Sequence, residues 1–264
     1  MTAIPKKVED RLKSEVKRYK RILNDAKSRD VNEADTVTIV KDIFSDIFGY
    51  DKYQELTSEY AIRSTYCDLA VKLGDKPHLL IEVKAIGLDL KESHLRQAVD
   101  YAAKEAIDWV VLTNGYLWEV YRLLFGRPTK YEPVFSTDLL EINIRNISEI
   151  EKLFLLTKEA AAKQAITAYH EEKQIKNKFV LAALLLQESV VDVIRKNFNR
   201  LSKEIRISNE EILDLLRGEV FKREVLEGEK AKQAEHTVKK KMGIVRKRKE
   251  KVDAKESIHV EESE

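Results

Sequence analysis

Several residue types are scarce in this chain, and each scarcity excludes a kind of protein. The single cysteine, Cys67, excludes an internal disulfide and a zinc site built on cysteines. The five histidines include no HExxH or HxxxH pair, which excludes the common helical zinc motif. None of the eight glycines lies in a GxxxxGK[S/T] phosphate loop, so we expect no ATP-driven motor of that kind in this chain.

Long apolar runs are also missing. The longest, FVLAALLL at residues 179–186, is too short to cross a bilayer, and residues 1–20 contain no hydrophobic signal segment. We therefore expect a soluble, cytoplasmic protein with no membrane partner. Charge is abundant but balanced, because 48 Lys and Arg oppose 46 Asp and Glu. The net charge of +2 argues neither for nor against nucleic acid.

The spacing of apolar residues divides the chain into four regions. Residues 1–28 carry the pattern of an amphipathic helix, and residues 29–145 alternate between helical and strand patterns. We predict that the second region is an α/β core, a mixed β-sheet flanked by helices. Residues 146–226 are predicted to be a helical C-terminal region, and residues 227–264 a charged, disordered tail.

Within the predicted core, helices and strands follow one another in a mixed order. One helix begins near Asp30 and ends before Gly49, and a second spans residues 91–106. Strands are predicted on both sides of a turn at residues 74–77. A later pair of strands is joined at Asn114-Gly115, a dipeptide typical of tight hairpin turns.

Two carboxylates and a lysine stand where a half-buried strand should be apolar. Glu82 and Lys84 are two residues apart, so their side chains leave the same face of the strand. If the preceding turn is centred near Asp75, Asp68 lies directly opposite Glu82, with Cβ atoms roughly 4.5–5.5 Å apart. At this separation the two carboxylates repel each other by about 3 kcal/mol, for an effective dielectric constant of about 20.

A bound divalent cation would turn this repulsion into chelation. Oxygen-only ligands favour Mg²⁺ or Mn²⁺ over zinc, and these ions support phosphodiester hydrolysis. The alternative is an exposed charged cluster on the sheet, because Glu-x-Lys is a common sequence in strands. The spacing alone leaves both interpretations open.

The same residues resemble a known nuclease signature. Asp68-(x)13-Glu82-Val83-Lys84 matches the D-(x)n-E-x-K pattern of the PD-(D/E)xK nucleases, with Cys67 in place of the usual proline. The resemblance implies a restriction-endonuclease-like core. It also implies that Asp68, Glu82 and the Val83 carbonyl hold Mg²⁺ or Mn²⁺, and that Lys84 is the catalytic lysine.

Flanking elements narrow the resemblance. Gln97 and Tyr101 resemble the Q-x-x-x-Y element that several of these nucleases carry after the lysine, which implies that they orient water, metal ligands or the DNA backbone. Residues 109–121 look like the hairpin of the amino-terminal nuclease domain of the type I restriction enzyme R protein (HsdR). Residues 33–36 and 48–51 are similar to that family's first helix.

Two further acidic residues are auxiliary candidates. Glu33 shares a helix face with apolar residues and could add an outer acidic group to the site. Asp30-x-x-Glu33 is also a capping box, and we prefer that interpretation of Glu33. Glu59 lies just upstream of the Asp68 strand, where a surface role is equally plausible.

The resemblance implies a Mg²⁺-dependent endonuclease that hydrolyses DNA, of the restriction, defence or DNA-processing type, without its own motor. DNA is then the expected partner, together with a motor or specificity subunit. The alternative is a non-enzymatic, nuclease-derived module that binds nucleic acid or protein through its long helices. Assembly into a homo-oligomer through the C-terminal helices is compatible with either function.

Overall fold

The computed structural model describes residues 3–62, 65–201, 204 and 206–243, with the backbone alone at residues 59–62 and 65–66. The chain divides into two compact units, Met1–His170 and Glu171–Glu264. The division falls inside helix α6 (Ala165–Ile175). Residues 146–170, which the sequence assigned to the C-terminal helical region, therefore belong to the first unit, and the predicted boundary lies too early in the chain.

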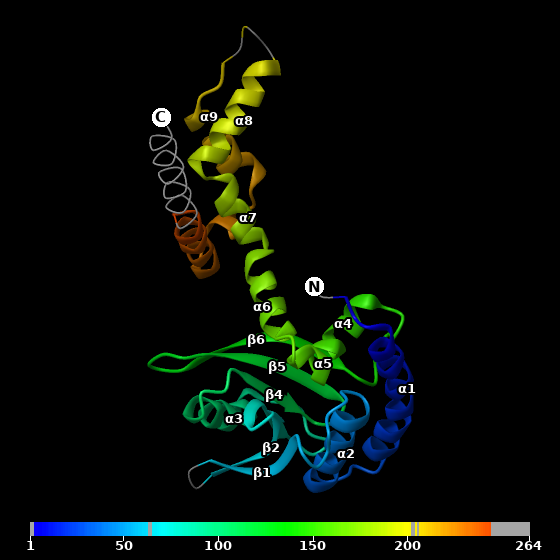
Figure 1. Cartoon of the computed structure of the whole chain (residues 1–264). Helices are drawn as coiled ribbons and strands as arrows, with labels where there is room; N and C mark the ends of the chain where they lie inside the picture. Colours follow the sequence, from blue (N-terminus) through cyan, green and yellow to red (C-terminus); the bar gives the residue numbers. More distant parts are fainter. Residues whose placement is uncertain (1–2, 63–64, 202–203, 205, 244–264) are drawn as a thin grey trace, which may run out of the picture. The chain divides into compact units, whose positions relative to one another are not determined.

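The first unit is built on a six-stranded sheet whose strands follow one another in chain order (Figure 1). Neighbouring strands are antiparallel except for β3 and β4, which are parallel because α3 (Glu92–Lys104) carries the chain back between them. This arrangement confirms the predicted mixed sheet. The strands are β1 (Leu56–Ile62), β2 (Thr65–Leu73), β3 (Lys76–Val83), β4 (Trp109–Thr113), β5 (Leu117–Leu124) and β6 (Lys130–Asp138).

Helices supply two separate apolar clusters to this sheet. The first cluster joins the sheet to α1 (Lys6–Ser28), α2 (Glu33–Asp46), α4 (Ile147–Leu155) and α5 (Lys158–Ala161). The amphipathic helix predicted within residues 1–28 is thus part of the core. The second cluster joins α3 to the sheet. Successive strand residues point to opposite faces, so Ile81 lies in the first cluster and Leu80 in the second.

The second unit consists of short helices, as predicted for this region. Helical structure also continues over residues 229–243, where Ala234 and Val238 pack against Val180 and Ala183. The disordered tail predicted from residue 227 is therefore wrong over this stretch, and residues 244–264 lie outside the described residues. The named elements after α6 are α7 (Lys178–Leu185), α8 (Glu188–Leu201), α9 (Asn209–Leu215), the π-helix η1 (Leu216–Val220) and α10 (Arg223–Leu226).

Among the helices that the structure describes, none has the length and apolar character needed to span a membrane.

Candidate active site

The structure brings Asp68 of β2 and Glu82 of β3 together. These strands are antiparallel, with Leu69 opposite Ile81 and Ala70 opposite Leu80. The same register continued by one residue puts Asp68 opposite Glu82, as the turn centred near Asp75 predicts. Both carboxylates leave the sheet on the face that carries Ala70 and Leu80, which is the face covered by α3.

Hydrogen bonds and ion pairs fix the three central side chains. The backbone N–H of Val83 donates to Asp68 Oδ2 at 2.7 Å, which holds that carboxylate against the end of β3. Lys84 Nζ lies 2.8 Å from Glu82 Oε1. The backbone N–H of Lys84 donates to the Thr113 carbonyl at 2.8 Å, so β4 fixes the main chain from which the lysine extends.

Burial makes the two carboxylates costly to ionise. Glu82 is only 2% exposed, and its Oε2 atom has no hydrogen-bond partner among the described residues. Burial, with the nearby Asp68 charge, raises the pKa of Glu82 to about 7, although Lys84 opposes the shift. Burial also raises the pKa of Asp68, against the lowering effects of the Val83 N–H and Lys84. The site therefore holds more negative charge than its lysine neutralises.

This charge imbalance fits a divalent cation. A buried carboxylate oxygen without a partner, beside a second carboxylate, is the kind of donor that Mg²⁺ or Mn²⁺ takes. Within the described residues, no group of three or more His, Cys, Asp or Glu is arranged to hold a metal. The candidate protein ligands are thus the two carboxylates, to which the resemblance adds the Val83 carbonyl, and an ion held by them would keep positions for water and phosphate oxygens.

Glu33 reaches the site, and the preferred interpretation of it was wrong. Helix α2 begins at Glu33 itself, and its N-cap is Asn32, whose side chain accepts a hydrogen bond from the Asp35 N–H. Glu33 is therefore not the third residue of a capping box that begins at Asp30. Its Oε2 lies 3.6 Å from Lys84 Nζ, which makes it a third carboxylate around the lysine.

The other predicted site residues, Gln97, Tyr101 and Glu59, have no described hydrogen bond or ion pair to Asp68, Glu82 or Lys84. Gln97 Nε2 donates to Tyr101 Oη at 2.7 Å, so the two residues do meet on one face of α3. No hydrogen bond or ion pair among the described residues links either of them to Asp68, Glu82 or Lys84. Glu59 lies on β1, but its side chain is outside the part of the chain that the structure describes.

One residue that positions the site was not recognised from the sequence. Asn114 is 1% exposed, and its Oδ1 accepts the Leu117 N–H at 3.0 Å. Its Nδ2 donates to the Leu88 carbonyl at 2.9 Å, across 26 positions of sequence. Asn114 thus ties the β4–β5 hairpin to the segment that follows Lys84. The sequence indicated only the turn, which the structure forms as a loop of residues 114–116 between the two strands.

Replacing Asn114 with alanine is expected to lower the free energy of unfolding by about 2 kcal/mol, because the Leu88 carbonyl and the Leu117 N–H lose their partners. Urea denaturation measures this change. Asn24→Ala is the matched control, since Asn24 is exposed on α1 and alanine is the better helix former there. Equal unfolding midpoints for wild type and Asn114→Ala would show that the tie is not stabilising.

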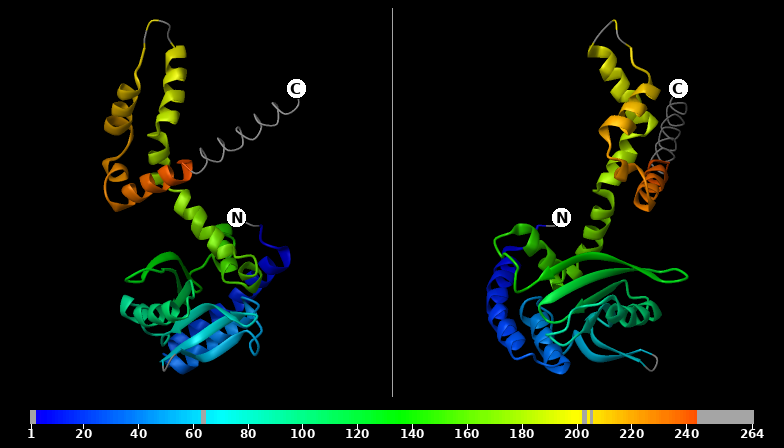
Figure 2. Two further views of the ribbon diagram at one scale, coloured as in Figure 1. Left: turned by 60° about the vertical axis from the view of Figure 1, so that its left-hand side comes forward. Right: turned by 180° about the vertical axis from the view of Figure 1, so that it is seen from behind.

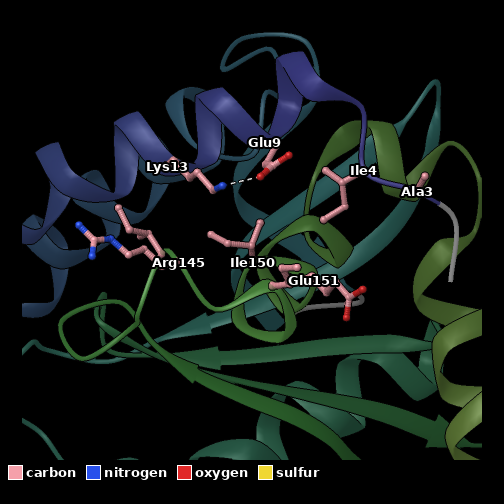
Figure 3. A pocket seen from close by; sticks show the side chains of 9 residues that line it. Ala3, Ile4, Glu9, Lys13, Arg145, Ile150 and Glu151 are labelled. Atoms are coloured by element: carbon pink, nitrogen blue, oxygen red, sulfur yellow. Dashed lines mark hydrogen bonds and ion pairs between the residues drawn. The ribbon is translucent and has the colours of Figure 1, made fainter.

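A hollow elsewhere in the first unit does not compete with this site. It has a volume of about 280 Å³ and lies between the start of α1 and α4 (Figure 3). Isoleucines, including Ile4 and Ile150, contribute to its lining. Lys13 and Glu9 face each other there as an ion pair, so their charges are satisfied within α1. The carboxylates that line the hollow, Glu9 and Glu151, are only partly buried, unlike that of Glu82.

Fold and site together define a class of protein. The first unit is a mixed sheet between helices, with an Asp on one strand facing the Glu of a Glu-x-Lys on the next. This is an α/β core of the restriction-endonuclease-like kind.

The family comparison is more specific. Residues 40–134 match the family model described as type I restriction enzyme R protein N terminus (HSDR_N). The match confirms the resemblance inferred from the sequence, and it spans Asp68, Glu82, Lys84 and the β4–β5 hairpin. Searches of curated proteins and of solved structures gave no match. This part of the chain is thus similar to a nuclease-like domain of the restriction-enzyme kind.

Proposed function

We propose that the chain is a Mg²⁺- or Mn²⁺-dependent endonuclease that hydrolyses DNA phosphodiester bonds at Asp68, Glu82 and Lys84. The observation that carries this proposal is the buried Glu82 carboxylate. One of its oxygens is held by Lys84, and the other has no partner among the described residues and belongs to a side chain next to Asp68. A purely structural role would leave that second oxygen buried without a partner, at a cost in stability.

The residues present divide the work of hydrolysis among them. Asp68, Glu82 and the Val83 carbonyl would hold the ion, which when bound neutralises a phosphate oxygen and makes water more acidic. Lys84 Nζ can donate a hydrogen bond to the attacking water or to a phosphate oxygen, where it offsets developing negative charge. The Glu82 and Glu33 carboxylates keep Lys84 charged. Burial alone would lower the pKa of Lys84, but the hydrogen bond to Glu82 and the nearby negative charges raise it.

Glu33, Gln97 and Tyr101 are proposed as supporting residues. Glu33 orients Lys84 through the ion pair described above. Gln97 and Tyr101, joined on α3, would orient water or the DNA backbone near the carboxylates. The proposal also includes a role in restriction, defence or DNA processing and a cytoplasmic location. The proposed partners are a motor or specificity subunit and a second copy of the chain, bound through the C-terminal helices.

The proposal is tested by incubating the purified full chain with supercoiled plasmid. Nicked and linear products are expected with Mg²⁺ or Mn²⁺ and not with EDTA. ATP is expected to change nothing, because the chain contains no GxxxxGK[S/T] loop. A chain that leaves the plasmid intact with either metal, yet binds it, would favour the non-enzymatic nucleic-acid-binding module instead.

A further inference from the structure

The ribbon formed by β5 and β6 extends past α3 and ends in an exposed tip (Figures 1 and 2). The tip, residues 124–130, has the sequence LFGRPTK. Leu124 is 38% exposed and Phe125 is 51% exposed. Two adjacent large apolar side chains held out at the end of a ribbon add little to the core, and such a surface is typical of an interaction site.

The charge of the tip favours a polyanionic partner. Arg127 and Lys130 are exposed, and the tip contains no Asp or Glu. By contrast, Arg122 of β5 already has partners within the protein, because it faces Asp108 and lies over the ring of Trp109. Basic and apolar side chains on one two-stranded ribbon are the combination with which proteins enter a DNA groove. An acidic protein surface would not by itself account for the exposed Phe125.

The residues that flank the tip pack on the face of the sheet that carries the carboxylates. Leu123, just before the tip, is buried in the α3-side cluster, and Tyr131, just after it, packs against the same cluster. Tyr131 Oη also hydrogen-bonds Glu92 at the start of α3. Asp68 and Glu82 leave the sheet on this same face, on which α3 also packs.

The spacing between the site and the tip matches a short length of duplex. Glu82 is opposite Leu112, which is opposite Glu119, and Phe125 lies six residues further along the chain, directly after the end of β5. Six residues extend about 20 Å, and crossing two strands adds about 10 Å, which gives a separation of roughly 22 Å. At about 3.4 Å per base pair this is six or seven base pairs, less than one helical turn.

We propose that residues 124–130 dock in a groove of duplex DNA, to one side of the bond that is cut. Arg127 and Lys130 contact phosphates there, and Phe125 lies against sugars or base edges. The inference rests on the proposed nuclease function for its choice of partner, and it extends that function by naming a DNA-binding element outside the catalytic residues.

The test is the affinity of the full chain for a fluorescein-labelled duplex of about three helical turns, measured by anisotropy at low salt in EDTA so that no cutting occurs. Arg127→Ala and Phe125→Ala are each expected to weaken binding about 5- to 10-fold. Arg127→Ala should also reduce the slope of log affinity against log salt by about one. Arg21→Ala and Tyr53→Ala are the matched controls, because both residues are exposed in the same unit.

Phe125→Trp adds a direct reporter of the tip. Both natural tryptophans are buried, Trp109 at 2% and Trp118 at 0% exposed, so a new exposed indole should dominate the change when DNA is added. Its fluorescence is expected to be quenched by the duplex and not by a matching concentration of inorganic phosphate.

The outcomes separate this inference from the nuclease itself. Tip variants that bind DNA like wild type, with an unquenched Phe125→Trp, would overturn the inference while plasmid cutting still tests the enzyme. Tip-dependent binding without any cutting would support the inference and contradict the proposed activity. A wild-type chain that binds no duplex at any salt concentration would overturn the inference as well.

Discussion

Replacing Lys84 with alanine is expected to reduce plasmid nicking by about 100- to 1000-fold, the usual cost of deleting one preorganised electrostatic group. Lys84 Nζ is the cation held 2.8 Å from Glu82 Oε1, and its side chain is 15% exposed. Without it, no ammonium of the described residues is paired with that carboxylate, so none is held there to position water or offset charge on the phosphate. Initial rates on supercoiled plasmid with Mg²⁺ measure the effect.

The matched control is Lys76→Ala, since Lys76 is exposed at the start of β3. This variant should cut the plasmid at the wild-type rate. Lys84→Arg keeps the positive charge, but a guanidinium does not reproduce the point charge of an ammonium. It is therefore expected to remain folded, as judged by circular dichroism, and to be slow. Wild-type nicking by Lys84→Ala would remove this residue from the mechanism.

Magnesium is expected to raise the melting temperature of the wild-type chain and to leave that of Glu82→Gln unchanged. Binding at 100 times the dissociation constant stabilises the folded state by about 2.7 kcal/mol. For a chain of this size that corresponds to roughly 5–10 °C. The amide keeps the shape of Glu82 but lacks the charge that would draw the ion, so its response should be lost. Differential scanning fluorimetry with and without Mg²⁺ measures both shifts.

Without metal, Glu82→Gln should be more stable than the wild-type chain. Burial and Asp68 raise the pKa of Glu82 to about 7 in the folded chain, from 4.5 when unperturbed. A raised folded pKa means that the contribution of this group to stability is fully present below about pH 4.5 and is lost as the pH rises through about 7. At pH 8, Glu82→Gln avoids that loss. Its free energy of unfolding is expected to exceed that of metal-free wild type by up to about 3 kcal/mol, and its melting temperature should be higher.

Glu141→Gln is the control for this comparison, because Glu141 is exposed and should change neither melting temperature nor metal response. A Glu82→Gln chain that keeps the full Mg²⁺ shift would place the ion elsewhere. A metal-free Glu82→Gln chain that melts lower than wild type at pH 8 would show that the carboxylate is satisfied without metal.

The carboxylate pair was predicted from the side-chain alternation of strands, although the pairing of β2 with β3 is not regular throughout. A turn centred near Asp75 and an even separation place Asp68 and Glu82 on one face, and the register Leu69 to Ile81 agrees with that prediction. A shift by one residue would have sent one carboxylate into the opposite core. Next to the turn Leu73 pairs with Lys76, so the register shift between Val71 and Lys72 is what brings Asp68 opposite Glu82, and no local pattern in the sequence indicated it.

Contacts between distant segments could not be predicted in the same way. Asn114 bonds the Leu88 carbonyl 26 positions away, and no local pattern encodes that distance. The position of Glu33 beside Lys84 depends on how α2 meets the end of β3, and the capping pattern at Asp30 was misleading because Asn32 is also a good N-cap. Residues 229–243 bury only a narrow apolar strip, which their many charges conceal in the sequence.

The most direct measurement maps the metal on the polypeptide itself. Fe²⁺ replaces Mg²⁺ in the full chain, and ascorbate with peroxide then generates hydroxyl radicals that cut the backbone next to the ion. The account predicts fragments that end near Asp68 and near Glu82–Lys84, suppressed by excess Mg²⁺ and absent from Glu82→Gln. Cuts confined to other segments, or the same cuts in Glu82→Gln, would contradict a metal centre at these carboxylates.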